Sequence, residues 1–277
     1  MLRPFYAGVA LAAFAAPTLA AGPLVLSNAD GINNNLPGFG PFTDDDAVAT
    51  SLDGNDGSLL FTVGGDLDAM HRLPNGNWLV SSLFNGSFGG SNFDDGDLVE
   101  IDLVNNVVVG NYFISNTMFT SSSPDITGVS LLPNGNILFS LLGSSNTIST
   151  PSGPVTFTDG DVMEFDVLTG NVSTFLSEAE LFDDGNGDVY GIHAFADGRL
   201  LLTTNTDESI SGATFRDGDA FLYDPATDSA SLYFSEDLFF DPTGVNGWDI
   251  DALYVIPSPG AAGLLALAGV ASARRRR

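Results

Sequence analysis

The sequence contains no cysteine and no lysine, and it has only two histidines in 277 residues. Without cysteine there is no disulfide, no thiol nucleophile and no thiolate metal site. Without lysine there is no phosphate-binding loop of the kind that depends on one, and no Gly-x-Ser-x-Gly nucleophile motif occurs either. We therefore predict no catalytic residues from the sequence.

Basic residues are scarce along most of the chain. All 35 acidic residues lie between residues 21 and 256, where only Arg72, Arg199 and Arg216 oppose them, which leaves this segment with a formal charge of −32. Nucleic acids and anionic membrane surfaces repel such a segment, because binding to them depends on Lys and Arg. Calcium, cationic partners or a saline medium suit it better. Hydrophobic residues make up 44% of the sequence, enough to bury a core, so the charge does not indicate disorder.

The first 20 residues are typical of a secretory signal peptide. Arg3 precedes an apolar run over residues 7–16, and Pro17 begins a stretch of small residues in which cleavage after Ala20 or Ala21 is expected. We predict that a signal peptidase removes this segment and that the protein is exported, with its body spanning residues 21–256.

The C-terminal segment, residues 257–277, has three parts. Pro257, Ser258 and Pro259 precede an apolar run over residues 261–273, and the chain ends in Arg274, Arg275, Arg276 and Arg277. The apolar run is shorter than the roughly 20 residues of a stable transmembrane helix. Because arginines favour the cytoplasmic side, this arrangement predicts a transient stop in the membrane.

This three-part order resembles the PEP-CTERM sorting signal, which exosortase-type transpeptidases of Gram-negative bacteria recognise and cut near the Pro-x-Pro during export. Ser258 stands where that family usually has Glu. An ordinary C-terminal membrane tail is the alternative. The resemblance implies an exported protein of the cell surface or extracellular matrix. It also implies a sorting enzyme as one partner, with exopolysaccharide or surface proteins as further ones.

Four segments of the body repeat one pattern, and each opens with an aspartate: Asp66, Asp125, Asp188 and Asp249. They are spaced 59, 63 and 61 residues apart. The first three opening segments are each followed by a turn, at residues 73–77, 132–136 and 195–199, where Asn-Gly or Asp-Gly supplies the positive φ of a tight hairpin. An Asp-Gly-Asp triplet at 95–97, 159–161 and 217–219 then opens a third β-prone run. We interpret each triplet as a hairpin turn with acidic, solubilising residues. Each unit is therefore predicted to be a four-stranded meander.

The first and last units complement each other. Residues 24–27, 47–52 and 58–63 supply a second, third and fourth strand, whereas residues 249–256 supply a first strand alone. Joined, they complete a fourth unit, which predicts an all-β, four-bladed β-propeller closed by its C-terminal strand. A β-solenoid is the alternative, although it has no reason to split a repeat. Long segments between strands two and three, at 28–43, 85–94, 143–158 and 205–216, are expected to be loops that carry binding.

Two interpretations of Asp66, Asp125, Asp188 and Asp249 stay open. The first strand of a blade lines the channel, so the four carboxylates could form a ring that binds Ca²⁺. Alternatively, each caps a turn through its side chain. A second candidate for calcium is the loop at 184–188, through Asp184 and Asn186, although it lacks the glycine and glutamate of an EF-hand.

His71 and His193 occupy the same place in their repeats, where the other two units have Ser130 and Tyr254. This equivalence favours packing positions over a catalytic base. We therefore predict a non-catalytic binding or structural propeller. A calcium-dependent hydrolase resembling the six-bladed propeller lactonases is the alternative, by analogy of fold alone. A hydrolase should have one asymmetric cluster of ligands in the channel, whereas a structural module should keep near-fourfold symmetry.

Overall fold

The computed structural model describes residues 23–28, 34–36, 39–120, 124–143, 145–238 and 250–257. Gly22–Ile256 forms one compact unit. The predicted signal peptide and residues 258–277 of the predicted sorting signal lie outside the described residues. Among the residues that are described, no helix has the length and apolarity needed to cross a bilayer.

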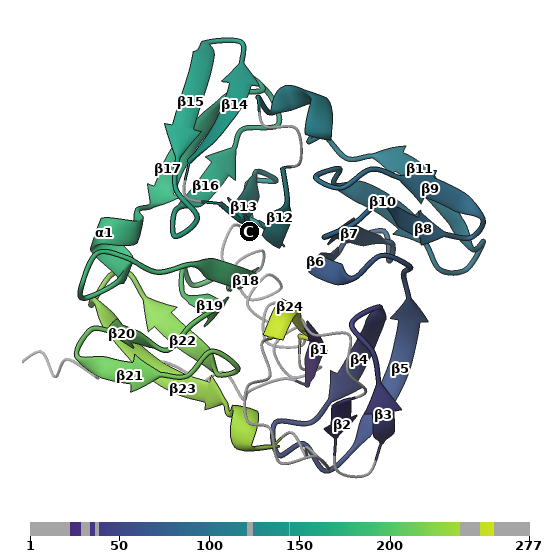
Figure 1. Cartoon of the computed structure of the whole chain (residues 1–277), viewed down its shortest axis with the longest axis horizontal. Coiled ribbons are helices and arrows are strands. Elements are labelled where there is room, and N and C mark those ends of the chain that lie inside the picture. Colours follow the sequence, from purple (N-terminus) through teal and green to yellow (C-terminus); the bar gives the residue numbers. More distant parts are fainter. Residues whose placement is uncertain are drawn as a thin grey trace, which may run out of the picture. The chain divides into compact units, whose positions relative to one another are not determined.

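The main strands form four antiparallel sheets of four strands each, the blades of a β-propeller (Figure 1). The fold predicted from the sequence is therefore confirmed. From the inside outward, blade 1 contains β24 (Ile250–Val255), β1 (Leu24–Asn28), β4 (Asp46–Thr50) and β5 (Gly57–Thr62). Blade 2 contains β6 (Leu67–Arg72), β7 (Trp78–Ser82), β10 (Val99–Asp102) and β11 (Val107–Asn111). Blade 3 contains β12 (Ile126–Leu131), β13 (Ile137–Leu141), β16 (Val162–Phe165) and β17 (Val172–Leu176). Blade 4 contains β18 (Val189–Ala194), β19 (Leu200–Thr204), β22 (Ala220–Asp224) and β23 (Ser229–Phe234).

Blade 1 is assembled from both ends of the body. β24 pairs antiparallel with β1, with Val255 opposite Leu24. The amide of Ile256 donates to the carbonyl of Pro23 at 2.9 Å, as Leu73 N donates to Asn77 O at 2.8 Å in the hairpin turn of blade 2. The two ends of the body therefore meet as the two sides of a missing turn.

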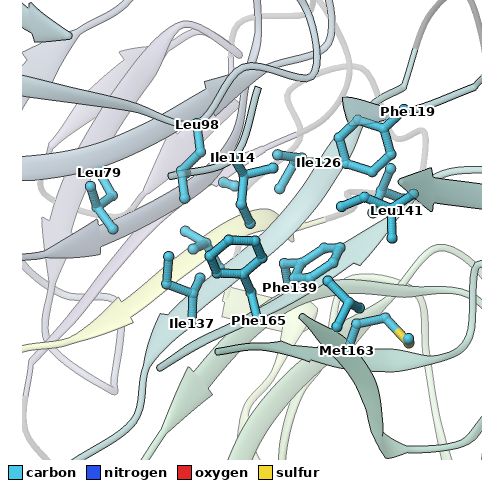
Figure 2. Close-up of a cluster of buried hydrophobic side chains, with 14 of the residues drawn as sticks. Leu79, Leu98, Ile114, Phe119, Ile126, Ile137, Phe139, Leu141, Met163 and Phe165 are labelled. Carbon is cyan, nitrogen blue, oxygen red and sulfur yellow. The ribbon is translucent and has the colours of Figure 1, made fainter. Parts of the chain in front are cut away.

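Hydrophobic packing is divided among the four junctions between blades. Every residue of the second strands β7, β13 and β19 is buried, because both faces of these strands meet a neighbouring blade, whereas the outer strand β11 alternates exposed and half-buried residues. Figure 2 shows the cluster between blades 2 and 3, where Leu79 and Leu98 meet Ile137 and Phe139. The other three junctions have equivalent clusters.

The segments expected to be long loops are β-hairpins instead. They are β2 (Asn34–Leu36) with β3 (Gly40–Phe42), β8 (Gly86–Phe88) with β9 (Ser91–Phe93), β14 (Asn146–Thr150) with β15 (Gly153–Phe157), and β20 (Glu208–Ile210) with β21 (Ala213–Phe215). Each ends in a buried phenylalanine: Phe42, Phe93, Phe157 or Phe215. Three of them also bond the segment that enters their blade, as when Thr120 N donates to Thr147 O at 2.9 Å. The hairpins therefore contribute to the core.

The predicted turn residues have the expected geometry, with φ of 94° at Gly76, 89° at Gly135 and 93° at Gly198.

The last aspartate of each Asp-Gly-Asp triplet has a structural role that the sequence did not reveal. Asp161 accepts from Thr158 N at 2.9 Å and from Glu178 N, the first residue of α1 (Glu178–Leu181), at 2.8 Å. Asp97 and Asp219 make the equivalent bonds, at the start of η1 (Asn116–Met118) and η2 (Glu236–Leu238). These aspartates join the third strand to the exit of the fourth, so describing them as solubilising was wrong.

Candidate functional site

The innermost strand of every blade has a β-bulge at the same place. Pairing with the second strand shifts between Leu67 and Ala69 in blade 2, and at the corresponding position in the other three blades. The side chains at these bulges are Asp68, Thr127, Tyr190 and Asp251. Bulges redirect side chains and recur beside functional sites. The bulged residue is the third of each repeat, and its side chain differs between blades.

Close contact between inner strands makes this region rigid. A Cβ added to Gly128 would lie 2.2 Å from the carbonyl oxygen of Tyr190 in the next blade, so only glycine fits there. The hydroxyl of Thr127 donates to Val189 O at 3.0 Å, and that of Thr203 donates to Ile250 O at 2.6 Å. Adjacent blades are thus fastened immediately beside the bulges.

Three carboxylates meet at this end of the axis. One oxygen each of Asp66, Asp68 and Asp251 lies within 4.8 Å of the others. Asp68 and Asp251 are each only 3% exposed. Asp66 has a φ of 67°, and its amide and that of Gly65 both donate to Asp45 Oδ1, at 2.9 and 3.0 Å. The trio therefore places a carboxylate of blade 1, on β24, close to two carboxylates at the start of blade 2.

Asp125 faces this trio from blade 3. Within the described part of the chain, neither carboxyl oxygen of Asp125 receives a hydrogen bond, nor does Oδ2 of Asp68. Burial, followed by the charges of Asp125 and Asp251, holds the pKa of Asp68 well above its usual range, and burial raises the pKa of Asp125 as well. Two ionised carboxylates can only accept, so a proton or a cation must lie between them. Asp125 therefore caps no turn.

The third position of the repeat is uncharged in blades 3 and 4. Thr127 contributes a hydroxyl that is already bonded, and Tyr190 is half-buried. Burial, followed by the charges of Asp251 and Asp188, raises the pKa of Tyr190 above that of an ordinary phenol. Tyr190 therefore stays protonated and can donate a hydrogen bond toward the acidic side. The site is asymmetric, because the third position of the repeat is a carboxylate in blades 1 and 2 and a hydroxyl in blades 3 and 4.

A second layer fills the axis at the sixth position of each repeat, with His71, Ser130, His193 and Tyr254. The two imidazoles stack with centroids 6.0 Å apart, and Tyr254 packs edge-on to both, at 5.2 and 5.1 Å. Ser130 Oγ lies 3.4 Å from His71 Nδ1. Burial lowers the pKa of His71 to about 4 and that of His193 to about 3. Both histidines are neutral packing residues, as predicted, and their layer lies apart from the carboxylates.

The remaining predicted site residues lie elsewhere. Asp188 receives a hydrogen bond from Asn205 Nδ2 at 3.5 Å and lies beside Asp159, whose pKa is raised by burial and then by this neighbour. Asp184 and Asn186 are exposed, and the carboxylate of Asp184 accepts from Asn186 N at 3.0 Å, closing a local turn. Asp249 lies outside the described residues. Among the described members of the proposed ring, only Asp66 belongs to the trio, and the sequence did not reveal Asp68 and Asp251.

No protein-family model matches the chain, and no sequence match to a curated protein is found. Several solved structures are similar in fold. Regucalcin from Agrobacterium tumefaciens, a calcium-binding protein, is 12% identical with a TM-score of 0.37, covering 78% of each chain. Luciferin-regenerating enzyme is 9% identical with a TM-score of 0.38, covering 78% of this chain and 81% of that one. An auxiliary nutrient binding protein from Bacteroides thetaiotaomicron is 12% identical with a TM-score of 0.35, and this chain covers 49% of its length. Similarities this weak say nothing about ligands or activity, and the four-bladed fold rests on the strand order given above.

Proposed function

We propose that this protein is an exported, non-catalytic binding and structural propeller whose axial site holds Ca²⁺. The observation that carries the proposal is the trio of Asp66, Asp68 and Asp251, together with the buried oxygen of Asp68 that accepts no hydrogen bond from the described residues. Calcium takes six to eight oxygen ligands from carboxylates, carbonyls and water. A divalent cation would attract each of the buried carboxylates and so offset the repulsion between them. A neutral ligand would leave that repulsion in place.

Export and surface location are supported by the sequence. The signal peptide and the PEP-CTERM-like segment at residues 257–277 resemble the two signals of a protein that is secreted and then processed by a sorting enzyme. The body, with a formal charge of −32 between residues 21 and 256, suits a hydrated matrix that contains divalent cations. Exopolysaccharide or other surface proteins are the partners that we propose.

A thermal melt tests the cation site. At a calcium concentration 100 times Kd, binding to the folded state alone stabilises by about 2.7 kcal/mol, which corresponds to a rise in Tm of roughly 5–10 °C for a domain of this size. Sodium chloride at equal ionic strength controls for screening. The variant Asp68→Asn should lose most of the rise, whereas Asp184→Asn, at an exposed carboxylate, should keep it. An unchanged Tm across millimolar calcium would exclude the site.

The asymmetry of the axial site favours one alternative function, a calcium-dependent hydrolase of the lactonase type. The carboxylates would hold the ion, and Tyr190 would donate a hydrogen bond to a substrate oxygen. The test is hydrolysis of simple lactones in calcium and in chelator. Activity that requires calcium and falls at least about tenfold in Tyr190→Phe would support the enzyme; calcium binding without turnover would favour the binding propeller.

A further inference from the structure

We propose that the cation at the trio acts as a clasp, fastening the ring-closing strand β24 to blade 2. This inference rests on the cation site proposed above and goes beyond it, because it states what occupancy does to the fold. Asp251 lies on β24, whereas Asp66 and Asp68 lie at the start of β6. An ion that takes an oxygen from each would span the junction at which the two ends of the body complete the ring.

The contacts of β24 differ between its two neighbours. Toward blade 4, polar bonds hold the strand: Thr203 Oγ1 donates to Ile250 O at 2.6 Å, and Val255 N lies 3.5 Å from His193 Nδ1. Toward blade 2 the strand packs by aromatic contact, with Tyr254 edge-on to His71 and to Trp78 at 5.2 and 5.3 Å. Beside this packing, the carboxylate of Asp251 faces those of blade 2.

Facing carboxylates make the junction between blades 1 and 2 dependent on a counter-charge. When no cation is bound, like charges that are held together in a buried position repel. When a divalent cation is bound, the same carboxylates become ligands and attract both strands toward one ion. At the junction between blades 3 and 4, the position equivalent to Asp68 is held by a direct bond, because the hydroxyl of Thr127 donates to the carbonyl of Val189.

β24 is the strand of the propeller that directly precedes the PEP-CTERM-like segment, so the clasp would bear any force applied to that segment. The strand ends at Val255, and the PEP-CTERM-like segment begins at Pro257. Any pull on the C-terminal segment, during processing or after attachment, is therefore transmitted first to β24. An occupied clasp resists the removal of this strand from the ring, and loss of the cation lowers that resistance.

Hydrogen exchange on the full chain, with calcium binding measured in parallel by calorimetry, tests the clasp. Calcium at 100 times Kd should slow exchange of β24 amides by up to about 100-fold, for openings that release the ion. Amides of β18, whose bulge carries Tyr190 instead of a carboxylate, should slow much less. The variant Asp251→Asn should bind calcium at least about tenfold more weakly and lose the selective effect on β24. Asp188→Asn, at a carboxylate outside the trio, should behave as wild type.

The outcomes separate the clasp from the cation site. Calcium binding with equal slowing in all four inner strands, or with none, would overturn the clasp and leave the site intact. Absence of calcium binding would overturn both.

Discussion

Buried charge decides the chemistry of this protein at the scale of single residues. Asp68 is 3% exposed and faces other carboxylates, and such a group is destabilising unless it is neutralised or paired. Its repeat equivalents Thr127 and Tyr190 are uncharged and can lie in the same position without a counter-ion. The repeat thus keeps one backbone geometry and varies the side chain, which is how a symmetric fold acquires an asymmetric site.

The buried histidines predict a loss of stability in mild acid. The pKa of His71 falls to about 4 and that of His193 to about 3 in the folded chain, against 6.5 in an unfolded one. As pH drops below 6.5 the unfolded state takes up protons and the folded state does not, so the free energy of unfolding falls by about 2 kcal/mol per histidine by pH 5. Denaturant titration at pH 7 and at pH 5 measures the loss.

His193→Phe isolates this effect. The ring would keep its contacts with Phe195 and Tyr254, at 4.9 and 5.1 Å in the wild type, and would no longer titrate. The variant should lose about 2 kcal/mol less than wild type between pH 7 and pH 5. Asp68 and Asp125, whose raised pKa acts in the opposite sense, are common to both proteins and cancel in the difference. Equal losses in the two proteins would contradict a neutral buried imidazole.

At the scale of elements, each blade carries a hairpin between its second and third strands, and that hairpin closes part of the core. Phe157, at the end of β15, is 3% exposed and packs edge-on to Phe139 of β13, with centroids 5.9 Å apart. Phe42, Phe93 and Phe215 are buried at the same place in the other hairpins. The hairpin lengthens each repeat to about 60 residues and adds a buried phenylalanine to the core of its blade. A shorter repeat without the hairpin would lack this residue.

Removing one of these aromatics should therefore cost as much as removing a core residue. Phe157→Ala is expected to lower the free energy of unfolding by about 3–5 kcal/mol. Phe175→Ala is the matched control in the same blade, since Phe175 is 38% exposed on the outer strand β17, and it should cost less than about 1 kcal/mol. Chemical denaturation of both variants checks the difference. Similar small losses would show that the hairpin is a surface attachment.

The four-stranded meanders were predictable because strand alternation and Asn-Gly turns are local signals. The hairpins were not, because their segments are rich in glycine, serine and asparagine and bury few apolar residues each. One signal was present: a phenylalanine stands directly before each turn that opens the third strand. The residues of the axial trio were also not predictable as a group from local signals. The constant repeat-opening aspartates drew attention, whereas the trio also needs Asp68 and Asp251 from a varied position, and their meeting depends on bulges that no sequence period reveals.

At the scale of the whole molecule, the two ends of the body lie where the other blades have a hairpin turn. Leu73 N to Asn77 O, Leu132 N to Asn136 O and Phe195 N to Arg199 O are turn hydrogen bonds of 2.8–2.9 Å, and Ile256 N to Pro23 O is their counterpart at 2.9 Å. Three residues separate the two partners within each turn. A three-residue Pro-Asn-Gly linker, copied from residues 74–76, should therefore join Ile256 to Pro23 without strain.

A circular permutant that uses this linker tests ring closure. New ends placed between Asn105 and Asn106, in the exposed turn between β10 and β11, would leave every blade with its hydrogen-bonded ladders intact. The permutant should fold, and its Tm should equal or exceed that of the unpermuted body, because blade 1 becomes continuous and β24 can no longer separate from a free end. Joining Ile256 directly to Pro23 is the matched control: the missing turn would strain β24 and lower the Tm. If both permutants melted alike, well below the parent protein, the two ends would not meet as the sides of a turn.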